Sequence, residues 1–161
     1  MSTLVPMTPA AFERYLAYAV SNYADVNIAS GRWKREDAMS LSKAAFTELL
    51  PDGLKTPGHY LYEIKAPSDS RTVGDLWAGE MHKNGMTTAF VYEIRILPEF
   101  RRQGHATRAM KALEPIVRAL GYPSIGLHVF GYNLEAQALY RKLGYSVMDM
   151  NMFKPLGKAG G

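Results

Sequence analysis

The run Arg101-Arg102-Gln103-Gly104-His105-Ala106 decides the fold of this chain. It follows a strand-like stretch at 90–97 and opens a helical pattern, in which apolar residues recur at three- and four-residue steps up to 120. A strand therefore runs into a basic turn that becomes a helix N-terminus. Unpaired backbone N–H groups and the positive end of the helix dipole make such a turn suitable for binding a phosphate or diphosphate. Gly104 lets the backbone approach the anion closely, because it has no Cβ.

The spacing of this turn does not fit two common phosphate-binding loops. A Walker loop needs Gly, four residues and then Gly-Lys-Ser/Thr, and the dinucleotide fingerprint needs three glycines. The stretch resembles instead the Arg/Gln-x-x-Gly-x-Gly/Ala loop with which the GNAT superfamily of N-acetyltransferases grips acetyl-coenzyme A. An ordinary basic strand-to-helix turn is the alternative for a pattern as short as this one.

A second motif strengthens the resemblance. Residues 133–145 read Asn-Leu-Glu-Ala-Gln-Ala-Leu-Tyr-Arg-Lys-Leu-Gly-Tyr. Asn133 is a good N-cap for a helix, and Gly144 is a natural residue to follow its end. The segment is similar to the GNAT signature Asn-x-x-Ala-x-x-Leu-Tyr-x-x-x-Gly-Phe/Tyr at every defined position. The chain is therefore identified as a member of this superfamily, and it also resembles a bacterial single-domain subgroup within it.

The predicted elements agree with that family. Thr8 and Pro9 mark the start of a first helix, a second helix begins near Lys34 or Arg35, and Asn84-Gly85 is typical of a tight hairpin. Strands are expected near Leu4 and at 60–64, 73–82, 88–97, 124–130 and 145–153, with helices after the turn at 101–106 and from 133. The expected fold is α+β, the GNAT acyl-CoA N-acyltransferase fold with a mixed central sheet flanked by helices.

One N-acetyltransferase domain over 1–161 is expected. Its coenzyme-binding core would cover about 59–154, and the helices within 8–50 would form the acceptor side. The 161 residues are 47% hydrophobic and 21% charged, a balance typical of a soluble globular protein. No apolar run reaches the 18 or so residues of a membrane helix, and no signal peptide is recognisable, so a cytoplasmic protein with no membrane partner is predicted.

Composition also limits the chemistry. There is no cysteine, so disulfides, thiolate metal sites and a cysteine nucleophile are excluded. The net charge is +4, but lysines and arginines are scattered in runs of two at most, and nucleic-acid binding is not expected. The four histidines are widely spaced and predict no metal site; they are His59, His82, His105 and His128.

The resemblance implies direct transfer from acetyl-CoA to an amine in a ternary complex. The backbone of 102–107 would hold the diphosphate with Arg101 nearby, and the backbone of 94–96 would pair with the pantetheine arm like an added strand. The family usually has glycine where this chain has Arg102, whose side chain either contacts a phosphate or faces solvent. The expected coenzyme-binding residues are Ile94, Arg95, Ile96, Arg101, Arg102, Gln103, Gly104, His105, Ala106, Thr107, Asn133, Ala136 and Tyr140.

Two catalytic residues are predicted. The family motif places Tyr140 near the thioester sulfur as general acid; the alternative is a core aromatic residue. Asn133 likewise is either a helix cap alone or also a coenzyme contact. Glu93 is the candidate base, because burial in mid-strand would raise its pKa toward a useful range. The alternatives are a solvated Glu93 or one paired with Arg95, with Glu80 or solvent as the base.

The acceptor is predicted to be a small-molecule amine that lies against the N-terminal helices. Tyr23, Asp25 and Trp33 are candidate lining residues, although core or surface packing also explains them. A protein or peptide acceptor and a non-catalytic CoA-binding sensor are the alternative functions. A homodimer is compatible with the sequence.

Overall fold

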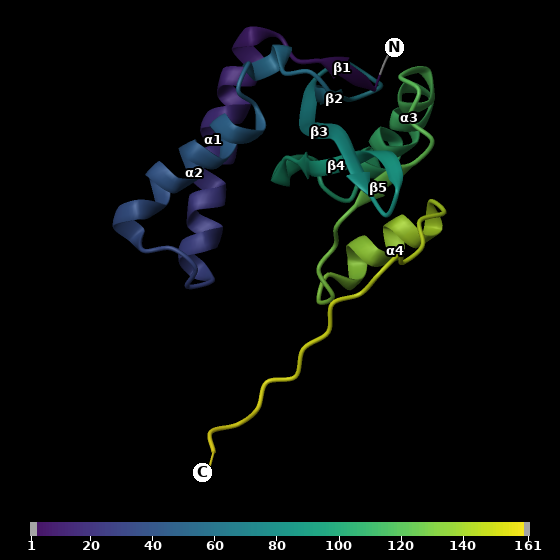
Figure 1. The fold of residues 1–161 in the computed structure, drawn as a ribbon. Helices are drawn as coiled ribbons and strands as arrows, with labels where there is room; N and C mark the ends of the chain where they lie inside the picture. Colours follow the sequence, from purple (N-terminus) through teal and green to yellow (C-terminus); the bar gives the residue numbers. More distant parts are fainter. Residues whose placement is uncertain (1–2, 160–161) are drawn as a thin grey trace. The chain divides into compact units, whose positions relative to one another are not determined.

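The computed structural model describes residues 3–159 and has two compact units, one over 1–128 and one over 129–161. The first unit holds all five strands and three of the α-helices (Figure 1). The second unit holds helix α4 (Leu134–Lys142). The α+β fold expected from the sequence is confirmed, with a mixed five-stranded sheet at its centre.

The sheet has the strand order β1-β2-β3-β4-β5. Its first four strands pair antiparallel, and β5 alone runs parallel to its neighbour, β4. The strands are β1 (Leu4–Pro6), β2 (His59–Lys65), β3 (Thr72–Lys83), β4 (Met86–Ile96) and β5 (Ile125–Leu127). A parallel pair requires a crossover connection, and the chain between β4 and β5 supplies it as a helix.

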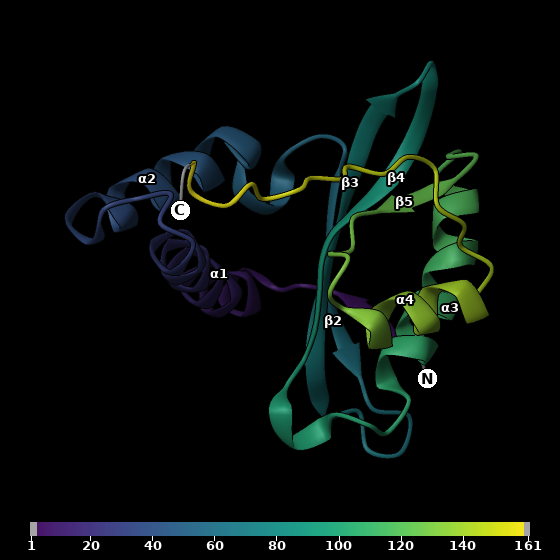
Figure 2. The ribbon, with the colours of Figure 1, turned by 90° about the horizontal axis from the view of Figure 1, so that it is seen from below.

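Helices cover both faces of this sheet. Helices α1 (Pro9–Ala29) and α2 (Arg35–Leu49) lie on one face, and α3 (His105–Ala119) lies on the other (Figure 2). Two short 3₁₀ turns, η1 (Gly53–Lys55) and η2 (Pro98–Phe100), follow α2 and β4. The start of α1 is as predicted, because the Thr8 hydroxyl accepts a hydrogen bond from the Ala11 backbone N–H at 3.1 Å.

Each face has its own apolar core. The Ser42 hydroxyl, fully buried, donates to the Val20 carbonyl at 2.7 Å and ties α2 to α1. On the face of α3, its buried positions repeat at helical spacing; they are Ala109, Met110, Leu113 and Val117. On the face of α1, the buried cluster contains Met7, Ala11, Tyr15, Ala19, Leu50, Leu61 and Trp77.

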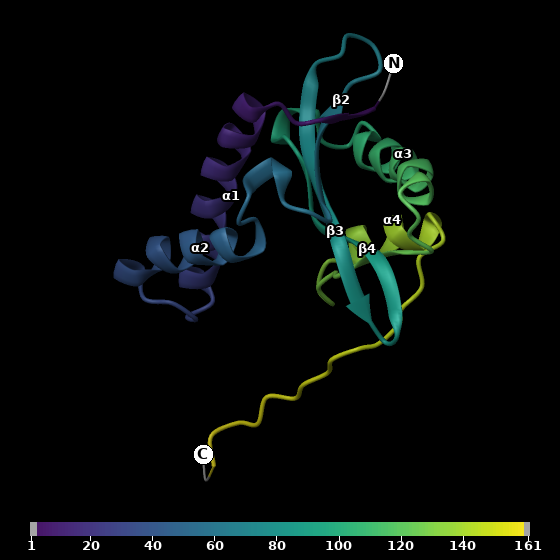
Figure 3. The same cartoon turned by 45° about the horizontal axis from the view of Figure 1, so that its top comes forward.

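The β3–β4 hairpin is the longest part of the sheet, and Figure 3 shows it between α1 and α3. Its turn has φ of +53° at Asn84 and +75° at Gly85, which confirms the tight hairpin predicted there. The pairing of β3 with β4 is interrupted once. Trp77 is opposite Glu93 but Ala78 is opposite Val91, so Tyr92 is an extra residue, a β-bulge in β4.

Two strand predictions differ from the structure. The strand expected at 124–130 is only β5, which ends at Leu127, opposite Val91. The bulge at Tyr92 begins at the next residue of β4 and accounts for the end of that pairing. The strand expected at 145–153 is wrong for the structure, which has neither strand nor helix there. Alternating residues favour an extended chain, but a strand also needs a neighbouring strand to pair with, and no strand of the described residues pairs with this segment.

Candidate active site

The turn between β4 and α3 has the geometry of an anion-binding loop. Gly104 has φ of +80° and stands at the N-cap position of α3, so the helix begins one residue earlier than the first apolar position of the pattern. Arg102 is also left-handed, with φ of +62°. Only glycine adopts this conformation without steric cost, which explains why the family usually has glycine where this chain has Arg102.

Side chains of this turn fold back onto their own backbone. The Arg101 Nε–H donates to the Ile96 carbonyl at 3.1 Å, and the Gln103 side-chain amide donates to the Glu99 carbonyl at 3.4 Å. Arg108, from the second turn of α3, donates to the Gln103 carbonyl at 3.0 Å. These contacts shape the loop. The first turn of α3 has no acidic side chain that would compete with an anion.

The sheet is open beside the end of β4. The parallel strand β5 pairs with Ala89 through Val91 only, whereas β4 continues to Ile96. The segment 94–96 therefore has β3 on one side and no paired strand of the described residues on the other. An extended ligand that adds to a strand edge needs such a gap, as predicted for a pantetheine arm.

Glu93 lies on the face covered by α1. Its Oε1 accepts a hydrogen bond from the Tyr15 hydroxyl at 2.6 Å. Burial raises the pKa of the Glu93 carboxyl above its ordinary value, and the Tyr15 hydrogen bond and the nearby Arg95 charge oppose that rise. The pKa of Tyr15 is itself raised, first by burial and then by Glu93, so its hydroxyl stays protonated and donates. Glu93 is therefore a desolvated carboxylate with one oxygen fixed.

The sequence suggested Arg95 as a salt-bridge partner for Glu93, and that alternative is wrong. Arg95 forms its salt bridge with Asp75, the residue opposite it on β3. Its guanidinium carbon also lies 3.6 Å from the centre of the Tyr18 ring, a cation–π contact with α1. Burial raises the pKa of the Asp75 carboxyl although the hydrogen bond from Arg95 opposes the rise. The Asp75–Arg95 pair thus stands beside Glu93 without neutralising it.

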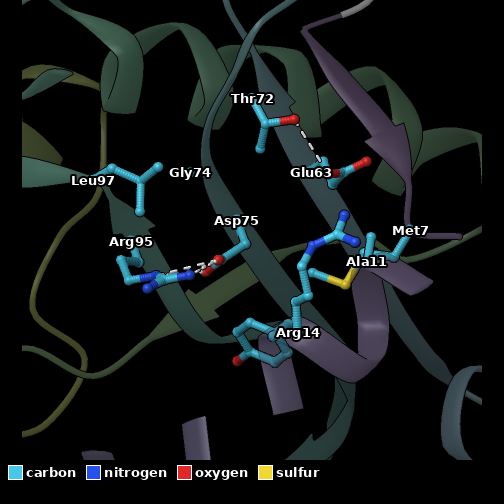
Figure 4. Close-up of a pocket in the computed structure, with 10 residues that line it drawn as sticks. Met7, Ala11, Arg14, Glu63, Thr72, Gly74, Asp75, Arg95 and Leu97 are labelled. Carbon is cyan, nitrogen blue, oxygen red and sulfur yellow. Dashed lines mark hydrogen bonds and ion pairs between the residues drawn. The ribbon is translucent and has the colours of Figure 1, made fainter. Parts of the chain in front are cut away.

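A cavity of about 230 Å³ lies between α1 and strands β2 to β4. Figure 4 shows Arg95 and Asp75 directed toward one another on one side, and Arg14 extended toward Glu63 on another. Tyr15 lines the cavity as well as binding Glu93, so the cavity borders the candidate base through this one ring. The remaining lining residues are Met7, Ala11, Thr72, Gly74 and Leu97.

Aromatic rings on the same face connect α1 and α2 to the sheet. Tyr23 is 5.3 Å from Trp33 and 6.0 Å from Phe46, between ring centres. Phe46 contacts Trp77, which stacks on Tyr92 at 4.6 Å. Two of the three predicted acceptor-side residues, Tyr23 and Trp33, are thus brought together. Asp25 is exposed.

His59 on β2 completes this aromatic group. The Trp77 Nε1–H donates to His59 Nδ1 at 3.0 Å, and burial lowers the pKa of the imidazole. A Cβ on Gly79 would lie 2.7 Å from His59 Nδ1, so glycine leaves the space that this ring occupies. The reserve base Glu80 follows Gly79 and is exposed. Successive strand residues point to opposite faces, so Glu80 faces away from the layer that contains Trp77 and Glu93.

The second unit holds the other predicted catalytic residue. Tyr140 on α4 is half-buried, burial raises its pKa, and its ring lies 5.7 Å from that of Tyr145. Asn133 caps α4 as expected, since its side-chain oxygen accepts from the Ala136 N–H at 3.2 Å. Gly144 follows the helix with φ of +98°. The motif thus forms the capped helix that its residues predict.

Residues 3–159 contain no group of three or more His, Cys, Asp or Glu side chains arranged to hold a metal ion. No helix among them has the length and apolar character needed to cross a membrane.

Comparison with known proteins gives the family. The model of the acetyltransferase (GNAT) family matches residues 28–145, which include the turn at 101–106 and the motif at 133–145. The chain belongs to the GNAT acetyltransferase family. This GNAT protein is 37% identical to the uncharacterized N-acetyltransferase YycN of Bacillus subtilis, over 95% of its own length and 97% of YycN. It is 34% identical to YdgE of the same organism, over 96% and 98% of the two chains.

Solved structures agree with this. The crystal structure of YycN superposes with a TM-score of 0.81 and covers 96% of this GNAT chain and 98% of its own. The aminoglycoside acetyltransferase AAC(6′)-Iy, in complex with the bisubstrate analogue CoA-S-monomethyl-acetylneamine, gives a TM-score of 0.62 at 16% identity, over 95% and 96% of the chains. That second likeness concerns the fold alone. The GNAT protein is therefore an acetyl-CoA-dependent N-acetyltransferase, as predicted.

The turn that would hold the coenzyme fits an anionic ligand. A Cβ on Gly104 would lie 3.1 Å from Arg108 Nη1, so a side chain there would crowd this guanidinium. The Arg108 Nε–H is buried without a hydrogen-bond partner among the described residues. The missing side chain at Gly104 and the positive end of the α3 dipole suit the approach of phosphate oxygens.

Tyr15, Asp75 and Arg108 were not expected from the sequence. Tyr15 matters to the site because its hydroxyl binds the candidate base. Its role depends on meeting Glu93 across 78 residues of sequence, and no local pattern signals such a contact. Asp75 gave one weak signal, since a carboxylate within a strand of apolar residues needs a partner.

Proposed function

We propose that this enzyme acetylates a primary amine on a small molecule, by direct attack within a ternary complex. The half-buried Glu93 carboxylate held by Tyr15 is the observation that carries the proposal. A base that works near neutral pH needs a raised pKa and a fixed orientation, and Glu93 has both. Its second oxygen, Oε2, is the one available to take a proton from the attacking amine.

The coenzyme would be held by two segments of the first unit. Backbone N–H groups from 102–107 would bind the diphosphate, and 94–96 would pair with the pantetheine arm along the open edge of β4. Acetyl-CoA supplies the acetyl group as an activated thioester. Backbone N–H groups at 94–96 would also donate to the thioester carbonyl as charge develops on its oxygen.

Tyr140 is proposed as the general acid. Its raised pKa keeps the phenol protonated near neutral pH, as a proton donor must be. Its hydroxyl would supply the proton that the leaving sulfur takes up. This role, and contacts of Asn133 and Ala136 with the coenzyme, require α4 to complete one N-acetyltransferase domain over 1–161, with a coenzyme core at about 59–154. They are the part of the proposal that rests on the family motif.

The acceptor is proposed to lie on the face covered by the helices within 8–50. The cavity of about 230 Å³ beside Tyr15 has the size of a small ligand rather than of a peptide segment. The partly exposed rings of Tyr23 and Trp33, on the same face, would favour a cationic amine. A peptide N-terminus or lysine is the second candidate acceptor, and a non-catalytic CoA sensor is the third candidate function.

The test is coenzyme release from acetyl-CoA with a broad panel of amines, diamines, aminoglycosides and short peptides. We expect turnover with at least one small amine and little with peptides. Glu93→Gln serves as the control, because release that persists in this variant is not catalysed by the proposed base. Faster turnover with peptides would favour the second candidate, and CoA binding without turnover on any acceptor would favour the sensor.

A further inference from the structure

Helix α1 covers two charged residues of β4 with two of its tyrosines. Tyr15 donates a hydrogen bond to Glu93, and the ring of Tyr18 lies 3.6 Å from the guanidinium carbon of Arg95. Residues three apart share a helix face and residues two apart share a strand face, so these contacts follow from one register of α1 on β4. The carboxylate and the cation therefore lie side by side on the same face, and each is fixed separately.

Asp75 on β3 determines where the cation lies. Asp75 is only 6% exposed, and a carboxylate buried to this extent needs a partner. The Arg95 Nε–H is shared between the two Asp75 oxygens, at 3.3 and 3.1 Å, and Nη2 donates to Oδ2 as well. Asp75 is opposite Arg95 in the register of β3 and β4. The guanidinium is thus bound by Asp75 at its edge and by Tyr18 on its face.

Glu93 is the other carboxylate that Arg95 could reach. The two residues follow the bulge and are two positions apart, so their Cα atoms are about 7 Å apart on one face of the strand. An arginine side chain is long enough to pair with a carboxylate at this spacing. A cation in contact favours the ionised form of a carboxyl group, and the carboxylate is then a weaker base.

We propose that Asp75 is a positioning residue of the reaction, which holds Arg95 away from Glu93 and so keeps the base without a cationic partner. This inference rests on the proposed role of Glu93 as the base. Asp75 touches neither the acceptor nor the coenzyme in this role, because it acts through the guanidinium that it binds.

The charges around Glu93 agree with this role. Burial and the Asp75 charge raise the pKa of Glu93, whereas the Tyr15 hydrogen bond and the Arg95 charge lower it. His59 of β2 reaches the same layer through Trp77, and burial lowers its pKa, so its imidazole is neutral near pH 7. The other titratable and charged groups on this face are Tyr18, Arg14 and Glu63.

The test is the pH dependence of the single-turnover rate with acetyl-CoA and an accepted amine. Asp75→Asn keeps the shape of the side chain and releases Arg95 to pair with Glu93. We expect the acidic limb of the profile to move to lower pH by about one unit, and the rate on the plateau to fall about tenfold. Asp75→Ser leaves room for water beside the guanidinium and should give the same shift, so it is the second variant if Asp75→Asn does not fold.

Two further comparisons separate positioning from a loss of charge or packing. In an Arg95→Gln background there is no cation to release, so adding Asp75→Asn should move the limb by less than about a third of a pH unit. Asp69→Asn is the matched control, because it breaks an aspartate–arginine pair with Arg71 that is exposed and lies outside the site. The limb of this control should stay at the position of the parent.

Three results would overturn the proposal. An unmoved limb in Asp75→Asn, with a lower free energy of unfolding, shows a structural role only. Equal shifts with and without Arg95 show that Asp75 acts on Glu93 directly, and a shift in Asp69→Asn as large as that in Asp75→Asn shows a general effect of charge. A parent rate in Glu93→Gln refutes the proposed base itself, and this outcome is distinct from a Glu93-dependent rate whose acidic limb does not respond to Asp75.

Discussion

Two parts of the same strand–turn–helix unit, Glu93 in β4 and the loop before α3, differ in their exposure to solvent. In β4, Glu93 is desolvated and bound by the Tyr15 hydroxyl of α1. Five residues past the end of that strand, at Arg101, the loop begins to expose arginines and backbone donors. Proton transfer needs a group whose pKa is shifted by burial, whereas anion binding needs many accessible donors. One strand and the loop that follows it can serve both needs, because Glu93 is desolvated and the loop is exposed.

The largest effect on the rate should come from a substitution at Glu93. Glu93→Gln keeps the size of the side chain and an oxygen that accepts from Tyr15, but it removes the base. We expect the single-turnover rate to fall by about 10²- to 10⁴-fold with CoA affinity nearly unchanged. Rapid mixing under single-turnover conditions measures the rate. A rate close to that of the parent would transfer the role to Glu80 or to solvent, and Glu80→Gln is the matched variant that separates these two.

Tyr140→Phe tests whether proton handling extends into the second unit. It removes only a hydroxyl, and we expect a fall of roughly 10- to 10³-fold in the single-turnover rate with coenzyme affinity nearly intact. A purely structural Tyr140 would instead lower the free energy of unfolding by about 1 kcal/mol and leave the rate unchanged. Tyr145→Phe is the control, because it removes a hydroxyl from the ring that packs against Tyr140.

Gly104→Val tests the anion-binding role of the loop before α3. The variant combines a branched side chain with φ of +80°, and it should weaken CoA binding at least tenfold, about 1.4 kcal/mol, with the fold retained. Gly121→Val is a matched control, since Gly121 lies beyond the other end of α3 with φ of +91° and no atom within 4 Å of its added Cβ. Titration of both variants separates loss of the site from backbone strain. Equal CoA affinity in the two would remove the anion-binding role.

Tyr15→Phe should produce a smaller effect, visible in the pH dependence of the rate. The base works in its ionised form, so the rate falls as the pH drops through the pKa of Glu93. The Tyr15 hydrogen bond lowers that pKa, and its loss leaves burial less opposed. The acidic limb of the pH–rate profile should therefore move to higher pH, with little change at alkaline pH. Tyr18→Phe, on the same helix, should leave the limb nearer its original position.

Arg102→Gly should have the smallest effect, and on stability alone. A left-handed conformation costs a non-glycine residue about 1–2 kcal/mol, and the greater freedom of glycine in the unfolded chain offsets part of that. We expect the free energy of unfolding to rise by roughly 0.5 kcal/mol, measured by urea denaturation. A decrease would mean that contacts of the Arg102 side chain outweigh its backbone strain.

The loop was readable in the sequence because its function lies in the backbone. Gly104, the basic residues and the helix that follows are contiguous, so spacing predicted the turn and the start of the helix. The cap at Asn133 and the hairpin at Asn84-Gly85 were predictable for the same reason. In each case the interactions that fix the conformation lie within a few residues of sequence.

The surroundings of Glu93 were not readable, because they depend on distant residues. Its hydrogen bond joins β4 to α1, and the Asp75–Arg95 pair requires the register of β3 against β4. The error at 145–153 has a related cause, since strand propensity is local but strand pairing is not. Glu93 itself was predicted as the base because a carboxylate in mid-strand is expected to be desolvated. Its partner, which is Tyr15 and not Arg95, could be identified only from the fold.

The bulge at Tyr92 determines which side of the sheet the candidate base serves. In a regular strand, neighbours alternate between faces, but here Tyr92 stacks on Trp77 while the next residue, Glu93, contacts Tyr15 in the same layer. The face on which the carboxylate lies therefore depends on the number of residues along β4 as well as on residue type. Deleting one residue at the bulge would restore regular alternation, so residues on one side of the deletion would change faces relative to residues on the other side. An insertion or deletion here would thus change which side chains face that layer without any substitution in the sequence.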